Sequence, residues 1–174
     1  MAAENGDLTL LQWLRVNGCL WGPETCAKAA SGGNLQVLQW LRANSCEWGE
    51  GTCDAAIEAG ARPCFCDPAA LTGRARWSGH VELLQWARLE GCPMHDDMAC
   101  MRAAGRGQLV VLQWLLANGS VWDSYTSLTA AAGGHLEVLQ WAREHGCPWS
   151  SETCTRAAQV PPPALCAHPP IPTP

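Results

Sequence analysis

Positively charged residues are scarce in this sequence. Its 11 lysines and arginines are outnumbered by 16 aspartates and glutamates, and the formal net charge is -5 at pH 7. Proteins that hold nucleic acid usually present a stripe of basic residues to the phosphates, so this charge balance argues against a nucleic-acid partner. Charged residues make up only 16% of the chain and hydrophobic ones 48%, which indicates a folded and not a disordered protein.

Long hydrophobic runs are also missing. No uninterrupted apolar stretch approaches the length that crosses a bilayer, so no membrane association is expected. The N-terminal stretch MAAENGDLTLLQWLRVNG lacks the basic segment followed by an apolar segment that is typical of an export signal. A cytoplasmic or nuclear location is therefore the default. In that reducing setting the 11 cysteines are expected to be thiols and not a disulfide framework.

Sequence signatures of catalysis are absent as well. The chain has no glycine-rich phosphate loop, His-Glu-x-x-His, Gly-x-Ser-x-Gly or paired catalytic carboxylates. The sequence thus predicts no catalytic residue, no cofactor and no metal ligand, and hence a protein that is not an enzyme. His80 and His135 are expected to cap helices or to form hydrogen bonds in turns, and His95 is expected to lie with Asp96 and Asp97 in a solvated loop that caps another helix.

What the sequence does contain is a repeat. The tripeptide Leu-Gln-Trp recurs with successive spacings of 27, 46, 28 and 27 residues. Its tryptophans are Trp13, Trp40, Trp86, Trp114 and Trp141. Eight residues beyond each lies a second bulky residue: Trp21, Trp48, Met94, Trp122 and Trp149. A fixed period between about twenty and fifty residues is typical of a solenoid, in which small units stack along an axis.

Each unit has room for two short helices joined by glycine. Residues 24–32 predict helix one, which ends in an alanine pair that lets a neighbour come close. A polar residue then opens helix two in every copy: Asp7, Asn34, His80, Gln108 and His135. In residues 35–42 the apolar side chains cover a wide arc, as expected for a helix packed on more than one side.

The tryptophans are predicted to be core residues. A unit this small cannot bury its own apolar face, so its neighbours must supply the other wall. We expect Trp40 and its equivalents to fill the seam between consecutive units, and Trp48 and its equivalents to close the loop after helix two. The Gln/Arg row on helix two is expected to be the solvated back: Gln39, Arg42, Gln85, Arg88, Gln140 and Arg143.

The repeated stretch T-C-x-x-A-A-x-x-G-H-L-E-V-L-Q-W resembles the ankyrin repeat. Thr153-Cys154 corresponds to the Thr-Pro of that family, Ala157-Ala158 to its alanine pair, and Gly134-His135 to its Gly-His. The resemblance is closest to the tryptophan-containing, short-period variant of algae, oomycetes and large DNA viruses. It implies an all-α, ankyrin-like solenoid of stacked helix-turn-helix units of about 27 residues.

The short period also implies a difference from ordinary ankyrin repeats. The residues missing relative to a period of about 33 fall where the family carries its long β-hairpins, so those fingers are not expected here. Family geometry then implies a non-enzymatic, monomeric module that binds another protein through helix one. The variable positions on that candidate face are Glu24, Lys28, Asp54, Glu58, Met101, Arg102, Thr155 and Arg156.

The repeat breaks in two places. Residues 61–79 are predicted to be an irregular insertion or a degenerate repeat between repeats 1–60 and 80–158, and a gene-model artefact is a further alternative. Residues 159–174 form a proline-rich tail expected to be disordered. The repeats start and stop in mid-unit, so one alternative is a truncated fragment without binding activity.

Cysteine supplies the remaining alternative. Cys19 and Cys26, and likewise Cys46 and Cys53, recur with the repeat, and buried thiols that pack as small hydrophobic residues explain them best. Cys64 and Cys66 lie close together, but no second pair provides the four ligands of a zinc site. A zinc- or redox-responsive protein that uses these two cysteines is the rival to the interaction module.

Overall fold

The computed structural model describes residues 1–59, 74–94 and 96–159, and every regular element in these ranges is a helix. The predictions for Cys64, Cys66, His95, most of the insertion 61–79 and the tail from residue 160 lie outside these ranges. The helices are α1 (Ala2–Asn5), α2 (Leu8–Val16), α3 (Pro23–Ser31), α4 (Leu35–Ala43), α5 (Thr52–Ala59), α6 (Arg74–Leu89), α7 (Asp96–Gly105), α8 (Leu109–Ala117), α9 (Ser124–Ala132), α10 (Leu136–Glu144) and α11 (Ser151–Gln159). The all-α prediction is confirmed for the described residues.

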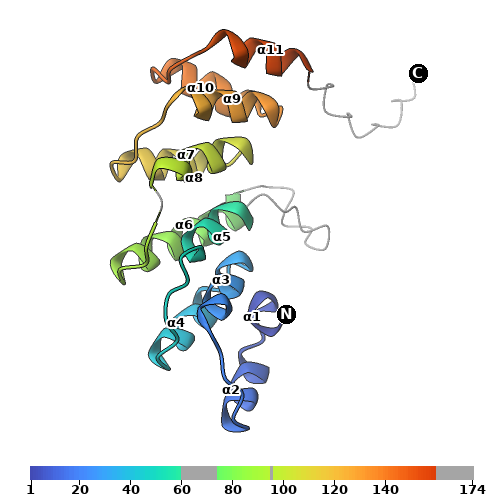
Figure 1. Cartoon of the computed structure of the whole chain (residues 1–174), viewed down its shortest axis with the longest axis vertical. Helices are drawn as coiled ribbons and strands as arrows, with labels where there is room; N and C mark the ends of the chain where they lie inside the picture. The colour runs from blue at the N-terminus through green and yellow to red at the C-terminus, as the bar shows by residue number, and fades with distance from the viewer. Residues whose placement is uncertain (60–73, 95, 160–174) are drawn as a thin grey trace, which may run out of the picture.

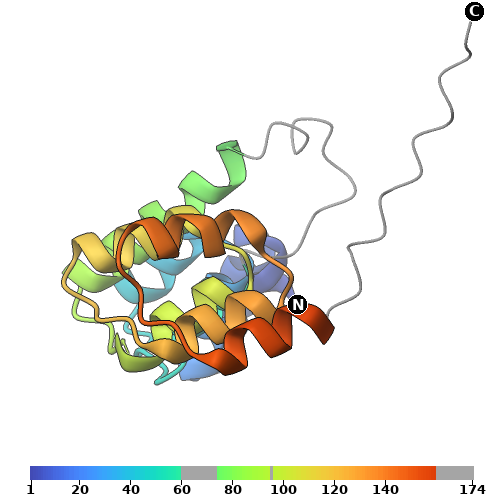
Figure 2. The ribbon, with the colours of Figure 1, turned by 90° about the horizontal axis from the view of Figure 1, so that it is seen from above.

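The helices form an elongated stack (Figure 1). The odd-numbered helices, which are the helices one of the repeat, contact one another in succession from α1 to α11. The even-numbered helices two form the second layer, where α4, α6 and α8 contact in turn. Figure 2, which looks along the stack, shows the two layers beside each other. Each helix pair of the sequence is thus one step of the stack.

Glycine sets most of the turns within the described residues. The turn between helix one and helix two contains a glycine with left-handed backbone, such as Gly33 (φ +71°) and Gly134 (φ +72°). The turn after helix two uses another, such as Gly119 (φ +88°), although Ser45 adopts the same conformation (φ +62°) in its unit. Residues with a Cβ rarely take this conformation, so the spacing of glycines fixes where each helix ends.

The core runs along the whole stack and consists mainly of aliphatic and small residues. Leu38, Leu84 and Leu112 of the helices two are fully buried. On the helices one, the alanine pairs are almost completely inaccessible, which permits close contact between neighbouring units. These pairs are Ala29-Ala30, Ala103-Ala104 and Ala130-Ala131.

The tryptophans lie at the edge of this core and not at its centre: several of them contact one another between consecutive units, as predicted, but at the surface and not as buried core residues. Most of them are half-buried against the aliphatic cluster. Trp13 on α2 is 61% exposed and Trp149, which precedes α11, is 37% exposed. Both belong to the end units of the described stack. Smaller side chains fill the centre of the core, because the units approach each other too closely there for an indole ring.

The interrupted unit differs from the others in its second helix. α6 begins at Arg74, six residues before His80, where the repeat pattern places the start of helix two. The last part of the range 61–79 therefore continues helix two towards its N-terminus. His80, expected at a helix start, lies inside α6 and is only 5% exposed. No helix in the described ranges has the length and apolar character needed to cross a membrane.

Candidate functional site

The residues predicted for the binding face all lie on odd-numbered helices. Glu24 and Lys28 are exposed on α3, and Thr155 and Arg156 are exposed on α11. On α11 the contacts are local: the Thr155 hydroxyl donates to the Ser151 carbonyl oxygen at 3.3 Å, and the Arg156 guanidinium lies 3.9 Å from the carboxylate of Glu152. These four side chains remain accessible to another molecule.

In the middle of the stack the predicted residues contact one another. Arg102 on α7 forms ion pairs with both Glu58 and Asp54 on α5, the second with a nitrogen-to-oxygen distance of 3.6 Å. Asp54 is only 8% exposed, so this carboxylate is part of the structure and not of the accessible face, which corrects its predicted place. Met101 is half-buried, and its carbonyl oxygen accepts a hydrogen bond from the hydroxyl of Thr129 at 3.0 Å. The ion pairs of Arg102 thus connect α7 with α5 of the preceding unit.

Replacing Arg102 by methionine is expected to lower the free energy of unfolding by about 1–3 kcal/mol. The change keeps the aliphatic stem but leaves the largely buried carboxylate of Asp54 without its cation. Arg106, exposed near the end of the same segment, provides the matched control. Arg106→Met should change stability by less than about 0.5 kcal/mol. Urea unfolding monitored by circular dichroism measures both, and equal effects of the two changes would contradict the assignment.

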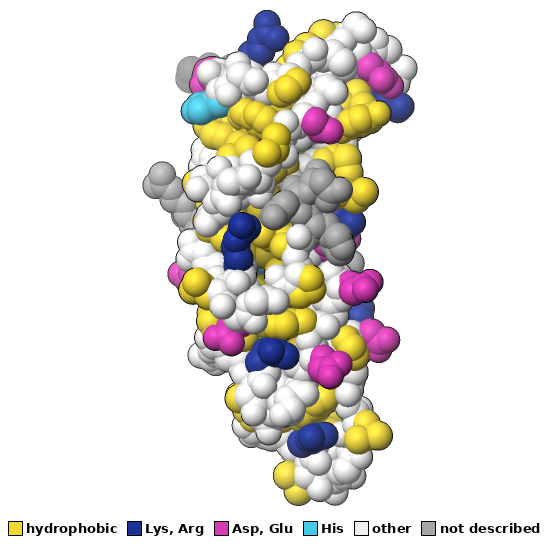
Figure 3. Space-filling view, turned by 60° about the vertical axis from the view of Figure 1, so that its left-hand side comes forward, with side chains coloured by type: hydrophobic (Ala, Val, Ile, Leu, Met, Phe, Trp, Pro, Cys, Tyr) yellow, Lys and Arg dark blue, Asp and Glu magenta, His cyan; other side chains and the backbone are white. Residues whose placement is uncertain are grey.

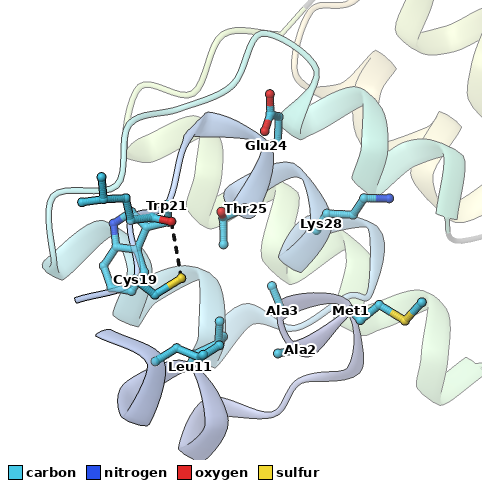
Figure 4. A pocket seen from close by; sticks show the side chains of 11 residues that line it. Met1, Ala2, Ala3, Leu11, Cys19, Trp21, Glu24, Thr25 and Lys28 are labelled. Atoms are coloured by element: carbon cyan, nitrogen blue, oxygen red, sulfur yellow. Dashed lines mark hydrogen bonds between the residues drawn. The ribbon is translucent and has the colours of Figure 1, made fainter. Parts of the chain in front are cut away.

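A hollow of about 390 Å³ opens beside the exposed charges of α3. Its floor comes from the first unit, with Ala3 and Leu11, and its wall from Trp21 (Figure 4). Glu24 and Lys28 also line it. The repeat pattern predicts these two charged residues on the candidate face but not the hollow, which forms where the short helix α1 packs against α3.

A strip of indole and guanidinium groups follows the helix-two side of the stack. The indole after one helix two contacts the indole on the next: ring centroids are 5.2 Å apart for Trp21 and Trp40, and 5.6 Å apart for Trp122 and Trp141. Trp48 and Trp86 make the equivalent pair at 5.8 Å. Such edge-to-face pairs add about 0.5–1.5 kcal/mol beyond the area that they bury. The tryptophans thus connect consecutive units at the surface.

Arginines cover the outer faces of several of these rings. The guanidinium carbon of Arg15 lies 4.3 Å from the centroid of Trp21, and that of Arg42 lies 4.6 Å from that of Trp48. Arg42 is half-buried, so the predicted solvated row needs a correction at this residue. Apolar side chains are visible between the charges over one side of the stack (Figure 3). Rings already stacked by arginine have one face less to offer a ligand.

The polar residues that open the helices two connect units instead of capping their own helices. The Asn34 side-chain amide donates to the carbonyl oxygens of Ala3 and Glu4, at 2.9 and 2.8 Å. Gln108 donates to the Ile57 carbonyl oxygen, and the Nε2 of His135 lies 3.1 Å from the carbonyl oxygen of Gly105. The local role predicted for His135, capping or a turn hydrogen bond, is corrected: its side chain makes no cap hydrogen bond, and its contact is with a carbonyl oxygen of the preceding unit. Only Asp7 caps its own helix, at 2.9 Å from the Leu10 nitrogen.

The cysteines form buried pairs within a unit. The Cys26 thiol donates to Cys46 with 3.1 Å between the sulfurs, and the Cys53 thiol donates to Cys92 at 3.0 Å. The hydrogen bond from Cys53 lowers the pKa of Cys92, while the same bond and burial raise the pKa of Cys53. Burial likewise raises the pKa of Cys26. The prediction of a buried thiol is wrong for Cys19, which is exposed, whereas Cys26, Cys46 and Cys53 are buried.

The described residues contain no cluster of three or more side chains that could hold a metal ion. Compared with known proteins, the chain matches no family model and none of the curated sequences. The interpretation of the candidate face consequently depends on its own residues.

Proposed function

We propose that this chain is a non-enzymatic protein–protein interaction module, a monomeric ankyrin-like solenoid whose odd-numbered helices face a protein partner. The main support for this proposal is that the buried positions of helix one vary little between units, whereas its accessible positions vary more. The buried positions repeat as apolar, mostly small residues from unit to unit, as in Ala29-Ala30, Ala56-Ile57 and Ala103-Ala104. The accessible positions differ in charge and size: Lys28 on α3 occupies the position of Ala55 on α5 and Thr129 on α9, although Glu24 recurs as Glu152 on α11.

Two further features support this proposal. The stack is held by contacts between neighbours that repeat along its length, which leaves the accessible residues of helix one free to vary without loss of the fold. The hollow beside Glu24 and Lys28 joins an apolar floor to two opposite charges. A protein segment that inserts an apolar side chain and pairs its flanking charges suits such a surface, because desolvated apolar anchors supply most of the binding energy at interfaces.

The test compares two double variants of the full chain. Glu24→Ala with Lys28→Ala removes accessible charge from α3, and Glu137→Ala with Gln140→Ala removes two exposed polar side chains from α10 as the matched control. Crosslinking in cells with quantitative mass spectrometry first identifies the proteins bound by the unaltered chain. Binding of the purified partner is then measured for both variants.

Loss of two interface charges is expected to weaken binding at least about tenfold, which corresponds to about 1.4 kcal/mol. The α10 variant should bind as the unaltered chain does. Equal binding by both variants, or loss with the α10 variant alone, would contradict the proposed face. If crosslinking found no specific protein partner for the unaltered chain, the proposed function itself would be contradicted.

A further inference from the structure

The repeat brings two sulfur atoms together in two of its units and replaces one of them by oxygen in the next two. The position on helix one is occupied by Cys26, Cys53, Cys100 and Ser127, and the position after helix two by Cys46, Cys92, Ser120 and Cys147. Only the units α3–α4 and α5–α6 therefore hold a dithiol. Burial of a small, weakly polar side chain explains all eight residues, but it does not require that two thiols meet.

The distances suit a covalent bond. The two sulfur atoms are 3.1 Å apart in Cys26 and Cys46 and 3.0 Å apart in Cys53 and Cys92, whereas a disulfide bond is about 2.05 Å long. If the two sulfur atoms of a pair approached each other by about 1 Å, they would reach the length of a disulfide bond. We propose that these two pairs are oxidisable dithiol sites, at which hydrogen peroxide forms a disulfide within the unit.

Cys92 is the residue that an oxidant reaches first. It is 7% exposed, whereas Cys53 and Cys26 are 1% and 0% exposed. Its thiolate attacks one peroxide oxygen, the O–O bond breaks, and the leaving hydroxide takes a proton, so that a sulfenic acid and one water form. The sulfur of Cys53 then attacks the sulfur of Cys92, the S–O bond of the sulfenic acid breaks as the S–S bond forms, and the leaving hydroxide takes the Cys53 proton as the second water. The two sulfurs are oxidised and the peroxide is reduced, with both thiol protons accounted for.

The consequence is a covalent link between the two helices of one unit. Cys53 lies at the start of α5, and Cys92 follows α6, 39 residues further along the chain. A bond between them encloses the segment whose described ends are Ala59 and Arg74. Such a closed loop restricts the unfolded chain, so oxidation should stabilise these units relative to the two that hold a single sulfur. This inference does not depend on the identity of any protein partner.

The experiment uses the full reduced chain, titrated with hydrogen peroxide and then blocked with an alkylating reagent under denaturing conditions. Peptide mass spectrometry should find Cys53 linked to Cys92 and Cys26 linked to Cys46, each link with the mass of two hydrogen atoms lost. Dithiothreitol should restore both pairs. Cys100 should remain alkylated, because its counterpart after helix two is Ser120.

The variant Cys53→Ser provides the second measurement. It copies the single-sulfur arrangement that the units α7–α8 and α9–α10 already tolerate, so the fold should persist. The link to Cys92 should disappear while Cys26 and Cys46 still join. The proposal is overturned if both pairs stay alkylated at peroxide levels that oxidise the exposed Cys19, or if Cys92 proceeds to a sulfinic acid that dithiothreitol does not reverse.

Discussion

Replacing Leu112 by alanine is expected to lower the free energy of unfolding by about 2–5 kcal/mol. The side chain lies on α8 in the middle of the stack and is fully buried. Its removal takes apolar surface away from the core and leaves a cavity that the closely spaced helices cannot fill completely. Because each unit relies on its neighbours for one wall of its core, the loss should affect the units on both sides. Urea unfolding monitored by tryptophan fluorescence and circular dichroism measures the change.

Leu89 is the matched control for this experiment. It lies on α6 and is 87% exposed, so Leu89→Ala should change the free energy of unfolding by less than about 0.5 kcal/mol. Similar losses for the two leucines would mean that the core is not where the structure places it. A loss at Leu112 confined to one spectroscopic probe would contradict the cooperative coupling of neighbouring units.

Gly133→Ala is expected to cost about 2–4 kcal/mol, although the backbone of this residue is ordinary (φ -80°). A Cβ there would lie 2.5 Å from Cδ2 of His135 and 2.7 Å from the carbonyl oxygen of Gly105 in the preceding unit. The added methyl group would push apart the two helices one and break the hydrogen bond from His135 to that oxygen. Thermal and urea unfolding should both register the loss.

Gly51 separates this steric effect from the general effect of alanine. A Cβ at Gly51 meets nothing within 4 Å, and its φ is not in the left-handed region. Gly51→Ala should therefore leave stability unchanged or raise it by about 0.4–1 kcal/mol, because alanine restricts the unfolded chain. If Gly133→Ala were equally harmless, the close approach of consecutive units would be wrong.

The sequence predicts the course of the chain well wherever the period is intact. The apolar arc of residues 35–42 corresponds to α4 (Leu35–Ala43), and residues 24–32 correspond to α3 (Pro23–Ser31). These elements are local: a helix of nine residues with glycine beyond its end is specified by its own sequence. The start of α6 at Arg74 is not evident from the repeat, since the Gly-His pair at residues 79 and 80 predicts a turn, as at Gly134-His135.

The sequence pattern indicates the contacts between units less clearly than it indicates the helices. Asn34 before a helix reads as a cap, yet its amide donates to carbonyls about thirty residues earlier. The sequence contained a signal, because Gln108 and His135 at the same position are poor helix caps and can donate. Asp54 shows the same limit: a variable charged residue on helix one predicts an accessible side chain, whereas Asp54 is buried and pairs with Arg102 on the next unit.

The stacking of each unit on the one before it is tested most directly by nuclear Overhauser effects from the ring protons of His135. The imidazole lies against Gly107, where an added Cβ would come within 2.5 Å of Nδ1. Strong cross-peaks from the His135 ring to the Hα protons of Gly107 are therefore predicted, 28 residues away in the sequence. Cross-peaks confined to Gly134, Leu136 and the first turn of α10 would show instead that His135 serves its own helix, and would contradict the stack.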